Sequence, residues 1–259
     1  MKICTAEFPD EQNLYAKAME GIAQHVSETN PDLLVLPEMP FAPWVFHADT
    51  YNEETWQHTV ENHAHWLTQL SNMIPTPIIT SRPITRDKKN LNEAFYMDHN
   101  RDIHCLHAKR YLPNDFPALE RVWFHEGEPA DAVFDIQGSK FGMQLCSEIM
   151  YTETPRKLAE NDVDIIVQSR ATGDHPRWRA ASLLAASTAG AYVVGANRRS
   201  VDRDWFTGGS WAYSPEGELL AETSATVSFV TVELDLDRAT NAKGEYPVTM
   251  YKHYNKLES

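Results

Sequence analysis

Hydrophobic and polar positions along the chain alternate in two rhythms, one helical and one strand-like. Leu14, Ala18, Ile22 and Val26 recur every four positions, the spacing of one face of an amphipathic helix. Asp32–Pro37 is instead short and almost continuously apolar, as expected for a strand covered on both faces. The first half of the chain therefore predicts the strand Lys2–Phe8, the helix Glu11–Ser27, the strand Asp32–Pro37, the helix Asn52–Met73, and the strands Pro77–Ile84, Ala94–Asp98 and Ile103–Ala108.

The second half follows a related plan and includes a hairpin. Ser214-Pro-Glu-Gly217 is a strong turn signal between two short strands. Asp164–Val167 matches Asp32–Pro37 in pattern, and this faint internal repeat places Glu38 and Arg170 at equivalent strand ends beside a shared cleft. The predicted elements are the strands Ala132–Ile136 and Lys140–Leu145, the helix Thr154–Glu160, the strand Asp164–Val167, the helix Pro176–Ala189, the strand Tyr192–Ala196, and the hairpin strands Ser210–Tyr213 and Glu218–Ala221.

Composition favours one soluble α/β domain over residues 1–259. The chain is 42% hydrophobic, and its 15 Pro and 11 Gly are scattered, so no stretch indicates a linker or a disordered tail. The start of the chain lacks the apolar core of a signal peptide, and no apolar run approaches the roughly 20 residues that span a bilayer. We therefore expect a cytoplasmic protein without membrane partners.

Charge and cysteine content narrow the function further. The formal net charge of -14 repels phosphate backbones and anionic membrane surfaces, which argues against a nucleic-acid partner. Cys4, Cys105 and Cys146 form an odd set at unrelated spacings, so we expect free thiols in a reducing compartment. The histidine pairs at 104 and 107 and at 63 and 65 match no zinc-site spacing, and we predict no metal site.

Three residues at predicted strand ends could carry chemistry together. Glu38 directly follows a buried strand, and the carboxyl ends of strands are where α/β sheets bind ligands. Cys146 lies between a strand and the polar start of a helix, and Lys109 ends another strand. Alone, each has a bland interpretation as a loop carboxylate, a core thiol or a surface lysine. A thiol with an unperturbed pKa of about 8.5 needs a base or a cation to attack near neutrality, and Glu38 and Lys109 would supply both.

Ordered motifs around these residues resemble those of the nitrilase or carbon–nitrogen hydrolase superfamily. They are Leu34-Val-Leu-Pro-Glu38-Met-Pro-Phe41, His107-Ala-Lys109-Arg-Tyr-Leu112, Glu120-Arg-Val-Trp-Phe-His-Glu-Gly127 and Gly142-Met-Gln-Leu-Cys146-Ser-Glu148. The resemblance spans nearly the whole chain. It implies a four-layer α-β-β-α sandwich, a homodimer or larger homo-oligomer, and an acyl-enzyme mechanism that needs no metal or organic cofactor.

The same resemblance assigns a role to each matching residue. Glu38 is implied as the general base, Cys146 as the nucleophile, and Lys109 as the cation that stabilises the tetrahedral intermediate. The backbone N–H of Ser147 would assist Lys109, and Glu120 would orient it. The segment after Cys146 departs from the family pattern, and this departure bears on the choice of substrate.

Several alternatives for the substrate and the function remain open. We expect a small-molecule amide first, with nitriles and N-carbamoyl amines served by the same residues. Arg170 is a candidate for pairing with a substrate carboxylate, and Trp123 could wall a pocket or simply pack in the core. Trp44, Phe46, Trp205 and Phe206 share both interpretations. A catalytically idle binding or scaffold protein is the alternative of a different class.

Overall fold

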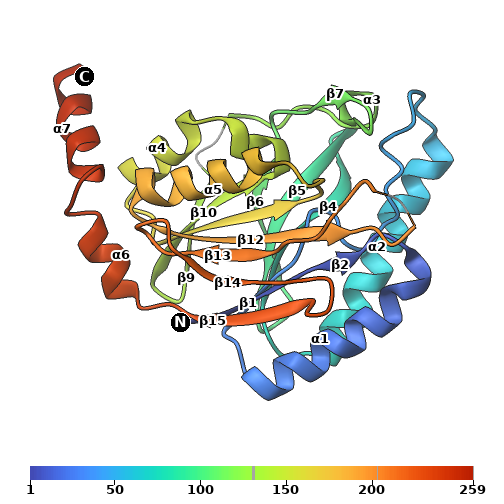
Figure 1. The fold of residues 1–259 in the computed structure, drawn as a ribbon. Helices are drawn as coiled ribbons and strands as arrows, with labels where there is room; N and C mark the ends of the chain where they lie inside the picture. The colour runs from blue at the N-terminus through green and yellow to red at the C-terminus, as the bar shows by residue number, and fades with distance from the viewer. Residues whose placement is uncertain (130–131, 203, 259) are drawn as a thin grey trace.

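Two β-sheets pack face to face, and helices cover the outer face of each (Figure 1). The computed structural model describes residues 1–129, 132–202 and 204–258, and side chains as far as residue 254. Among these residues no helix is both long and apolar enough to cross a membrane.

The first sheet comprises β15 (Phe229–Glu233), β1 (Lys2–Ala6), β3 (Leu33–Val35), β4 (Ile78–Arg86), β5 (Lys89–Met97) and β6 (Ile103–Ala108), in that spatial order. Strands β1, β3 and β4 run parallel at its centre. The outer strands β15, β5 and β6 pair antiparallel. The three parallel strands therefore end at the same edge of the sheet.

The second sheet repeats this plan. Its spatial order is β14 (Leu219–Glu222), β13 (Trp211–Tyr213), β12 (Tyr192–Arg199), β11 (Ile165–Arg170), β10 (Ser139–Leu145) and β9 (Val133–Ile136), and β2 (Phe8–Pro9) also pairs with β12. Strands β10, β11 and β12 are parallel, and β9, β13 and β14 join antiparallel. The parallel centre of this sheet also presents three carboxyl ends at one edge.

Four helices form the two outer layers. α1 (Tyr15–Thr29) and α2 (Glu53–Met73) cover the first sheet, and α4 (Glu153–Glu160) and α5 (Pro176–Ala189) cover the second (Figure 1). α1 buries Met19, Ile22 and Val26, so its spacing follows from burial of one face. The Asn52 side chain caps α2 by accepting from Thr55 N. The remaining elements are η1 (Gln12–Leu14), β7 (Asn114–Asp115), β8 (Ala118–Leu119), α3 (Glu120–Trp123), η2 (Cys146–Met150), α6 (Leu236–Ala242) and α7 (Val248–Glu258).

Three apolar layers hold the sandwich together. Between the sheets, Leu33 and Val35 of β3 pack in one cluster with residues such as Leu145 and Val167 of the second sheet. A second layer joins the first sheet to α1 and α2, and a third joins the second sheet to α4, α5 and α7. Because each sheet is covered on both faces, central strands such as β3, β11 and β12 are almost wholly buried. The predicted α-β-β-α sandwich is confirmed.

Differences from the predicted elements are local. The predicted strand Lys2–Phe8 is two strands, because the chain turns at Glu7 and β2 leaves the first sheet to join the second. The predicted helix Glu11–Ser27 opens with the short 3₁₀ segment η1, and β5 begins five residues earlier than predicted, at Lys89. β15 is not among the predicted elements, and its residues are mostly only partly buried.

Candidate active site

The ends of the central strands of the two sheets are joined where Glu38 leaves β3. The backbone N–H of Glu38 donates to the carbonyl of Arg170 at 3.3 Å, and the Ser169 hydroxyl donates to the Leu36 carbonyl at 2.8 Å. β3 belongs to the first sheet and β11 to the second. The internal repeat thus places two equivalent strand ends in contact, and the chemistry gathers at this junction.

A buried lysine lies between two buried carboxylates. Lys109 Nζ donates to Glu38 Oε1 at 2.7 Å and to the two carboxylate oxygens of Glu120 at 2.8 and 2.7 Å. All three side chains are almost wholly excluded from solvent. Asn92 Nδ2 donates to the same Glu38 oxygen at 2.8 Å. Lys109 and Asn92 therefore fix one oxygen of Glu38, while its other oxygen, Oε2, is buried without a partner among the described residues.

Burial and charge act in opposite directions on this network. Burial alone would lower the pKa of Lys109, but the charges of Glu120 and Glu38 outweigh it and raise that pKa. Lys109 is therefore a permanent cation. For Glu120, burial raises the pKa to about 7, although Lys109 opposes the rise. Glu120 is consequently the member of this network that titrates near neutrality.

Cys146 is presented at a strained turn. It follows β10 as the first residue of η2 and has φ of +46°, a left-handed conformation that a residue with a Cβ seldom adopts. Met39, directly after Glu38, is also left-handed, with φ of +43°. The Cys146 Sγ lies 3.9 Å from the carbonyl oxygen of Ala171. Two residues that flank or form the candidate site thus share the same unusual backbone.

The Cys146 thiol is neutral at rest. Burial raises its pKa most, the negative charge of Glu38 raises it further, and Lys109 opposes both effects. Glu38 and Glu120, which are joined through hydrogen bonds to Lys109, are together with that lysine the charged groups that act on this thiol. A neutral thiol needs a proton acceptor, not a lowered pKa, to become a nucleophile.

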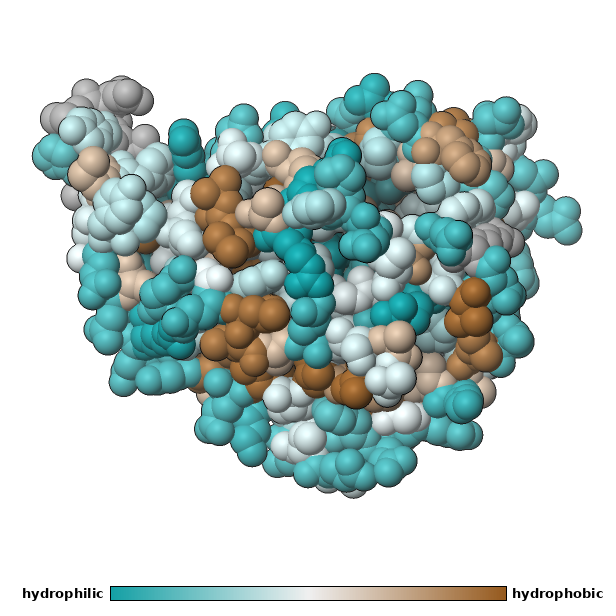
Figure 2. Space-filling view, in the orientation of Figure 1, coloured by the Kyte–Doolittle hydropathy of each residue, from teal (hydrophilic) through white to brown (hydrophobic). Residues whose placement is uncertain are grey.

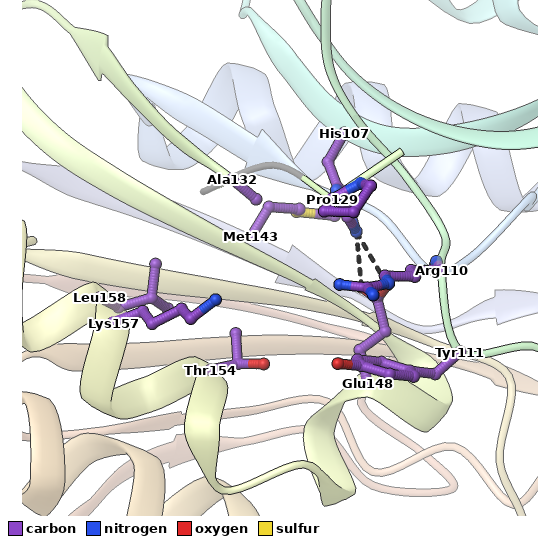
Figure 3. Close-up of a pocket in the computed structure, with 10 residues that line it drawn as sticks. All are labelled: His107, Arg110, Tyr111, Pro129, Ala132, Met143, Glu148, Thr154, Lys157 and Leu158. Atoms are coloured by element: carbon purple, nitrogen blue, oxygen red, sulfur yellow. Dashed lines mark hydrogen bonds and ion pairs between the residues drawn. The ribbon is translucent and has the colours of Figure 1, made fainter. Parts of the chain in front are cut away.

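Glu148 ties the segment of Lys109 to the segment of Cys146. Its carboxylate accepts from His107 Nε2 at 2.8 and 3.0 Å, an interaction drawn in Figure 3. It also accepts from the backbone N–H of Arg110 at 2.8 Å and of Leu145 at 2.9 Å. Arg110 follows Lys109 and Leu145 precedes Cys146. One buried side chain therefore sets the spacing of two candidate catalytic residues.

Arg198 holds the loop that carries Glu38. Its guanidinium donates to the Met39 carbonyl at 2.5 Å and to the Ala42 carbonyl at 2.7 Å, and it pairs with Asp10 at 2.5 Å. Arg198 is fully buried at the end of β12. The sequence alone did not assign these supporting roles to Asn92, Glu148 or Arg198. Their common signal was a polar residue inside or next to a buried strand.

The match to a known family covers almost the whole sandwich. The model of the carbon–nitrogen hydrolase family matches residues 3–243. The chain belongs to the carbon–nitrogen hydrolase family. A curated relative, an (R)-stereoselective amidase from a Pseudomonas species, is 31% identical over 143 residues, which cover 54% of this chain and 52% of the relative. The match thus spans about half the length of that relative.

Solved structures share the fold of this carbon–nitrogen hydrolase at low sequence identity. A carbon–nitrogen hydrolase from Helicobacter pylori G27 superposes with a TM-score of 0.83 at 20% identity, covering 100% of this chain and 98% of that one. An amidase from Nesterenkonia sp. superposes with a TM-score of 0.76 at 18% identity, covering 98% and 96%. At this level of identity, the likeness supports the fold alone.

The side chains of Ser147 and Trp123, two further predicted site residues of this hydrolase, form their hydrogen bonds outside the buried network. The Ser147 hydroxyl donates to the Tyr111 carbonyl, which leaves its backbone N–H as the group beside Cys146. Trp123 is buried in an aromatic cluster, and its ring N–H donates to the Ala48 carbonyl at 2.9 Å. This cluster holds Met39, Trp44, Phe46, Trp56, Leu112, Trp123, Phe124 and Phe206. Because it includes the neighbour of Glu38, it supports the loop of the candidate base.

Arg170, the candidate for binding a substrate carboxylate, lines a cavity of its own. Arg170 ends β11, and its guanidinium lines a cavity to which none of the four residues of the network contributes. Within the part of the chain that the structure describes, no group of three or more His, Cys, Asp or Glu side chains is placed to hold a metal ion.

Proposed function

We propose that this carbon–nitrogen hydrolase cleaves a small amide through a thioester on Cys146. The observation that carries the proposal is the buried arrangement of Lys109 between Glu38 and Glu120, next to a neutral thiol on a strained turn. Buried charges are costly unless they are paired, and strained backbone persists at sites where it is used. The relationship to an (R)-stereoselective amidase supports an amide substrate.

The first half of the reaction forms the thioester. The unpartnered Oε2 of Glu38 takes the thiol proton as the Cys146 sulfur attacks the carbonyl carbon of the amide. The carbonyl oxygen becomes an oxyanion, which the Lys109 ammonium and the Ser147 backbone N–H stabilise. Collapse of the tetrahedral intermediate breaks the C–N bond. Glu38 returns the proton to the departing nitrogen, and ammonia or an amine leaves.

The second half releases the acid. Glu38 takes a proton from water, and the resulting hydroxide attacks the thioester carbon. The second tetrahedral intermediate collapses by breaking the C–S bond, and the Cys146 sulfur regains a proton from Glu38. Glu120 keeps Lys109 in place throughout, through bonds of 2.8 and 2.7 Å. All proton transfers use groups of this chain, the substrate and water.

The substrate panel must separate three related classes. Primary amides are our first choice, whereas nitriles and N-carbamoyl amines would use the same nucleophile and base. Ammonia release is measured from simple amides, ω-amides of dicarboxylic acids, N-carbamoyl amino acids and nitriles. We expect turnover of amides by the wild type and none by Cys146→Ala. Cys105→Ala is the matched control, because Cys105 is the exposed free cysteine on β6 and should leave turnover unchanged.

A second variant tests the base separately from the nucleophile. Glu38→Gln keeps the oxygen that accepts from Lys109 and Asn92, so the fold should persist. We expect kcat to fall by roughly 10²- to 10⁴-fold, the usual contribution of a general base. Alkylation of Cys146 by iodoacetamide should slow as well. Silence of the wild type across the panel, together with an unreactive Cys146, would favour the binding or scaffold alternative.

A further inference from the structure

A cavity lined by charged and polar residues lies on the outer face of the second sheet. It has a volume of about 690 Å³ and is bounded by the ends of β11 and β12, by β13, by the start of α5 and by the turn at Gly208–Gly209. In Figure 2, hydrophilic side chains gather over the region where the start of α5 lies above β12 and β13. Glu38, Lys109, Glu120 and Cys146 are absent from its lining. The four residues of the proposed reaction therefore do not form the wall of this cavity.

Arg170 is the unusual residue of this cavity. It is only 1% exposed, yet no carboxylate within the described ranges forms an ion pair with it. The neighbouring arginines all have such a partner: Arg179 pairs with Glu222, Arg199 with Glu7, and Arg198 with Asp10. A buried charge without a counter-charge is unfavourable. Arg170 is thus the one cation of this group whose partner the described chain does not supply.

The two terminal nitrogens of the Arg170 guanidinium have hydrogen-bond acceptors, whereas its Nε has none among the described residues. Its two terminal nitrogens donate to the Gly209 carbonyl at 2.5 Å and to the Thr172 hydroxyl at 3.4 Å. Its plane lies over Trp211, with the guanidinium carbon 3.5 Å from the ring centroid. Arg170 Nε and Trp211 Nε1 both lack a partner. Both also lie close to Gly195, where a Cβ would come within 2.9 Å of Trp211 Nε1 and 3.6 Å of Arg170 Nε.

Of the arginines around the cavity, Arg170 alone has no ion-pair partner among the described residues. Glu222 and Glu7 are engaged by Arg179 and Arg199, and Asp174 lies on the exposed rim. Burial lowers the pKa of Arg170 to about 9, the charge of Arg179 adds to this effect, and Glu7 only partly offsets it. A ligand with a single negative charge would supply the missing partner of Arg170.

We infer that this cavity binds a small carboxylate, with Arg170 as its anchor. A guanidinium presents parallel N–H donors that match the two oxygens of a planar carboxylate, and Trp211 orients that fork. The carboxylate has two sources: the far end of an amide substrate, or a separate small acid. The first source rests on the proposed function, whereas binding of a free acid does not.

Binding is tested directly by calorimetric titration at constant ionic strength. Acetate, propionate and benzoate are the probes, and at least one should bind the wild type with a saturable isotherm. Arg170→Met should weaken binding by about tenfold or more, because it removes a charged hydrogen-bond donor. Arg170→Lys keeps the charge without the fork and should weaken it less. Arg177→Met is the matched control, since Arg177 is exposed on the first turn of α5 outside the cavity.

The source of the carboxylate is resolved by a pair of substrates of similar size. If it belongs to the substrate, the wild type prefers succinamate over butyramide through KM, and Arg170→Met abolishes the preference. If it is a separate acid, both amides have similar KM values while titration still shows binding. Equal binding by the wild type and both Arg170 variants, or no binding and no preference in the wild type, overturns the inference. Absence of all turnover contradicts the proposed function but leaves the titration decisive.

Discussion

Glu38 and Arg170 stand at equivalent strand ends of the two sheets, but their charges are treated in opposite ways. Glu38 is fully buried and accepts from Lys109 and Asn92. Arg170 is equally buried, yet it donates only to a carbonyl and a hydroxyl. The backbones of the two residues are in direct contact, with Glu38 N donating to the Arg170 carbonyl at 3.3 Å. Glu38 and Arg170 therefore differ in the charge of their hydrogen-bond partners and not in how deeply they are buried.

At Glu38 the chain itself supplies the opposite charge, whereas at Arg170 a ligand would supply it. In the Glu38 network the single cation Lys109 is shared by two carboxylates, so loss of the lysine would leave both carboxylates unpaired. At Arg170 the fold already tolerates an unpaired cation, so that cation can be removed at little cost. The two regions should respond in opposite directions when one charge is replaced by an apolar side chain of similar length.

The largest effect is expected from Lys109→Met. This change leaves Glu38 and Glu120 buried without their shared cation, and removal of one partner of a buried ion pair typically costs about 3–5 kcal/mol. We expect the free energy of unfolding to fall by about this amount and turnover to fall by several orders of magnitude. Urea unfolding followed by circular dichroism measures the first. Lys157→Met, at an exposed lysine of α4, is the control and should be neutral.

A smaller loss is expected from Glu148→Gln. The amide keeps only one of the two carboxylate oxygens, so either the backbone N–H of Leu145 or that of Arg110 loses its acceptor. An unsatisfied buried donor costs about 1–3 kcal/mol, and displacement of Lys109 relative to Cys146 should lower kcat by roughly 10- to 100-fold. Glu153→Gln, on the first turn of α4, is the control. A normal kcat together with reduced stability would show that Glu148 supports the fold without positioning the site.

Glu148 also illustrates what the sequence could and could not predict. The order of strands and helices followed from apolar spacing, and segments such as α2, α5 and β6 were predicted within one residue. The strand ends followed as well, because a polar residue directly after a buried strand lies at the edge of the sheet. Glu38, Lys109 and Cys146 were identified in this way.

The partners of these residues could not be predicted because they are distant in sequence. Asn92 is 54 positions from Glu38, and Glu148 is 38 positions from Arg110. Apolar spacing carries no information on such pairs. The left-handed backbone of Cys146 was also invisible, since it arises from packing at the end of β10 and not from a glycine. The unpaired state of Arg170 depends on every neighbouring element and was equally hidden.

A moderate effect with a defined pH range is expected from Glu120. Its pKa of about 7 means that it becomes protonated as the pH falls through neutrality, and a neutral Glu120 holds Lys109 less firmly. We therefore expect kcat/KM to decline as the pH falls through about 7 and to become constant only well above that pH. Glu120→Gln mimics the protonated form, so its pH profile should lose this acidic limb and lie at the lower level throughout. A limb at an unchanged pH in the variant would assign it to another group.

The smallest effect, and the one of opposite sign, is expected from Arg170→Met. The change removes a buried cation that has no counter-charge, at the cost of the hydrogen bond to the Gly209 carbonyl and the contact with Trp211. Because the relief of a buried charge offsets these losses, the free energy of unfolding should stay within about 1 kcal/mol of the wild type or rise. The same urea unfolding used for Lys109→Met measures it, without added carboxylate. A loss as large as that of Lys109→Met would show that Arg170 already has a structural counterpart, and the contrast between the two strand ends would no longer hold.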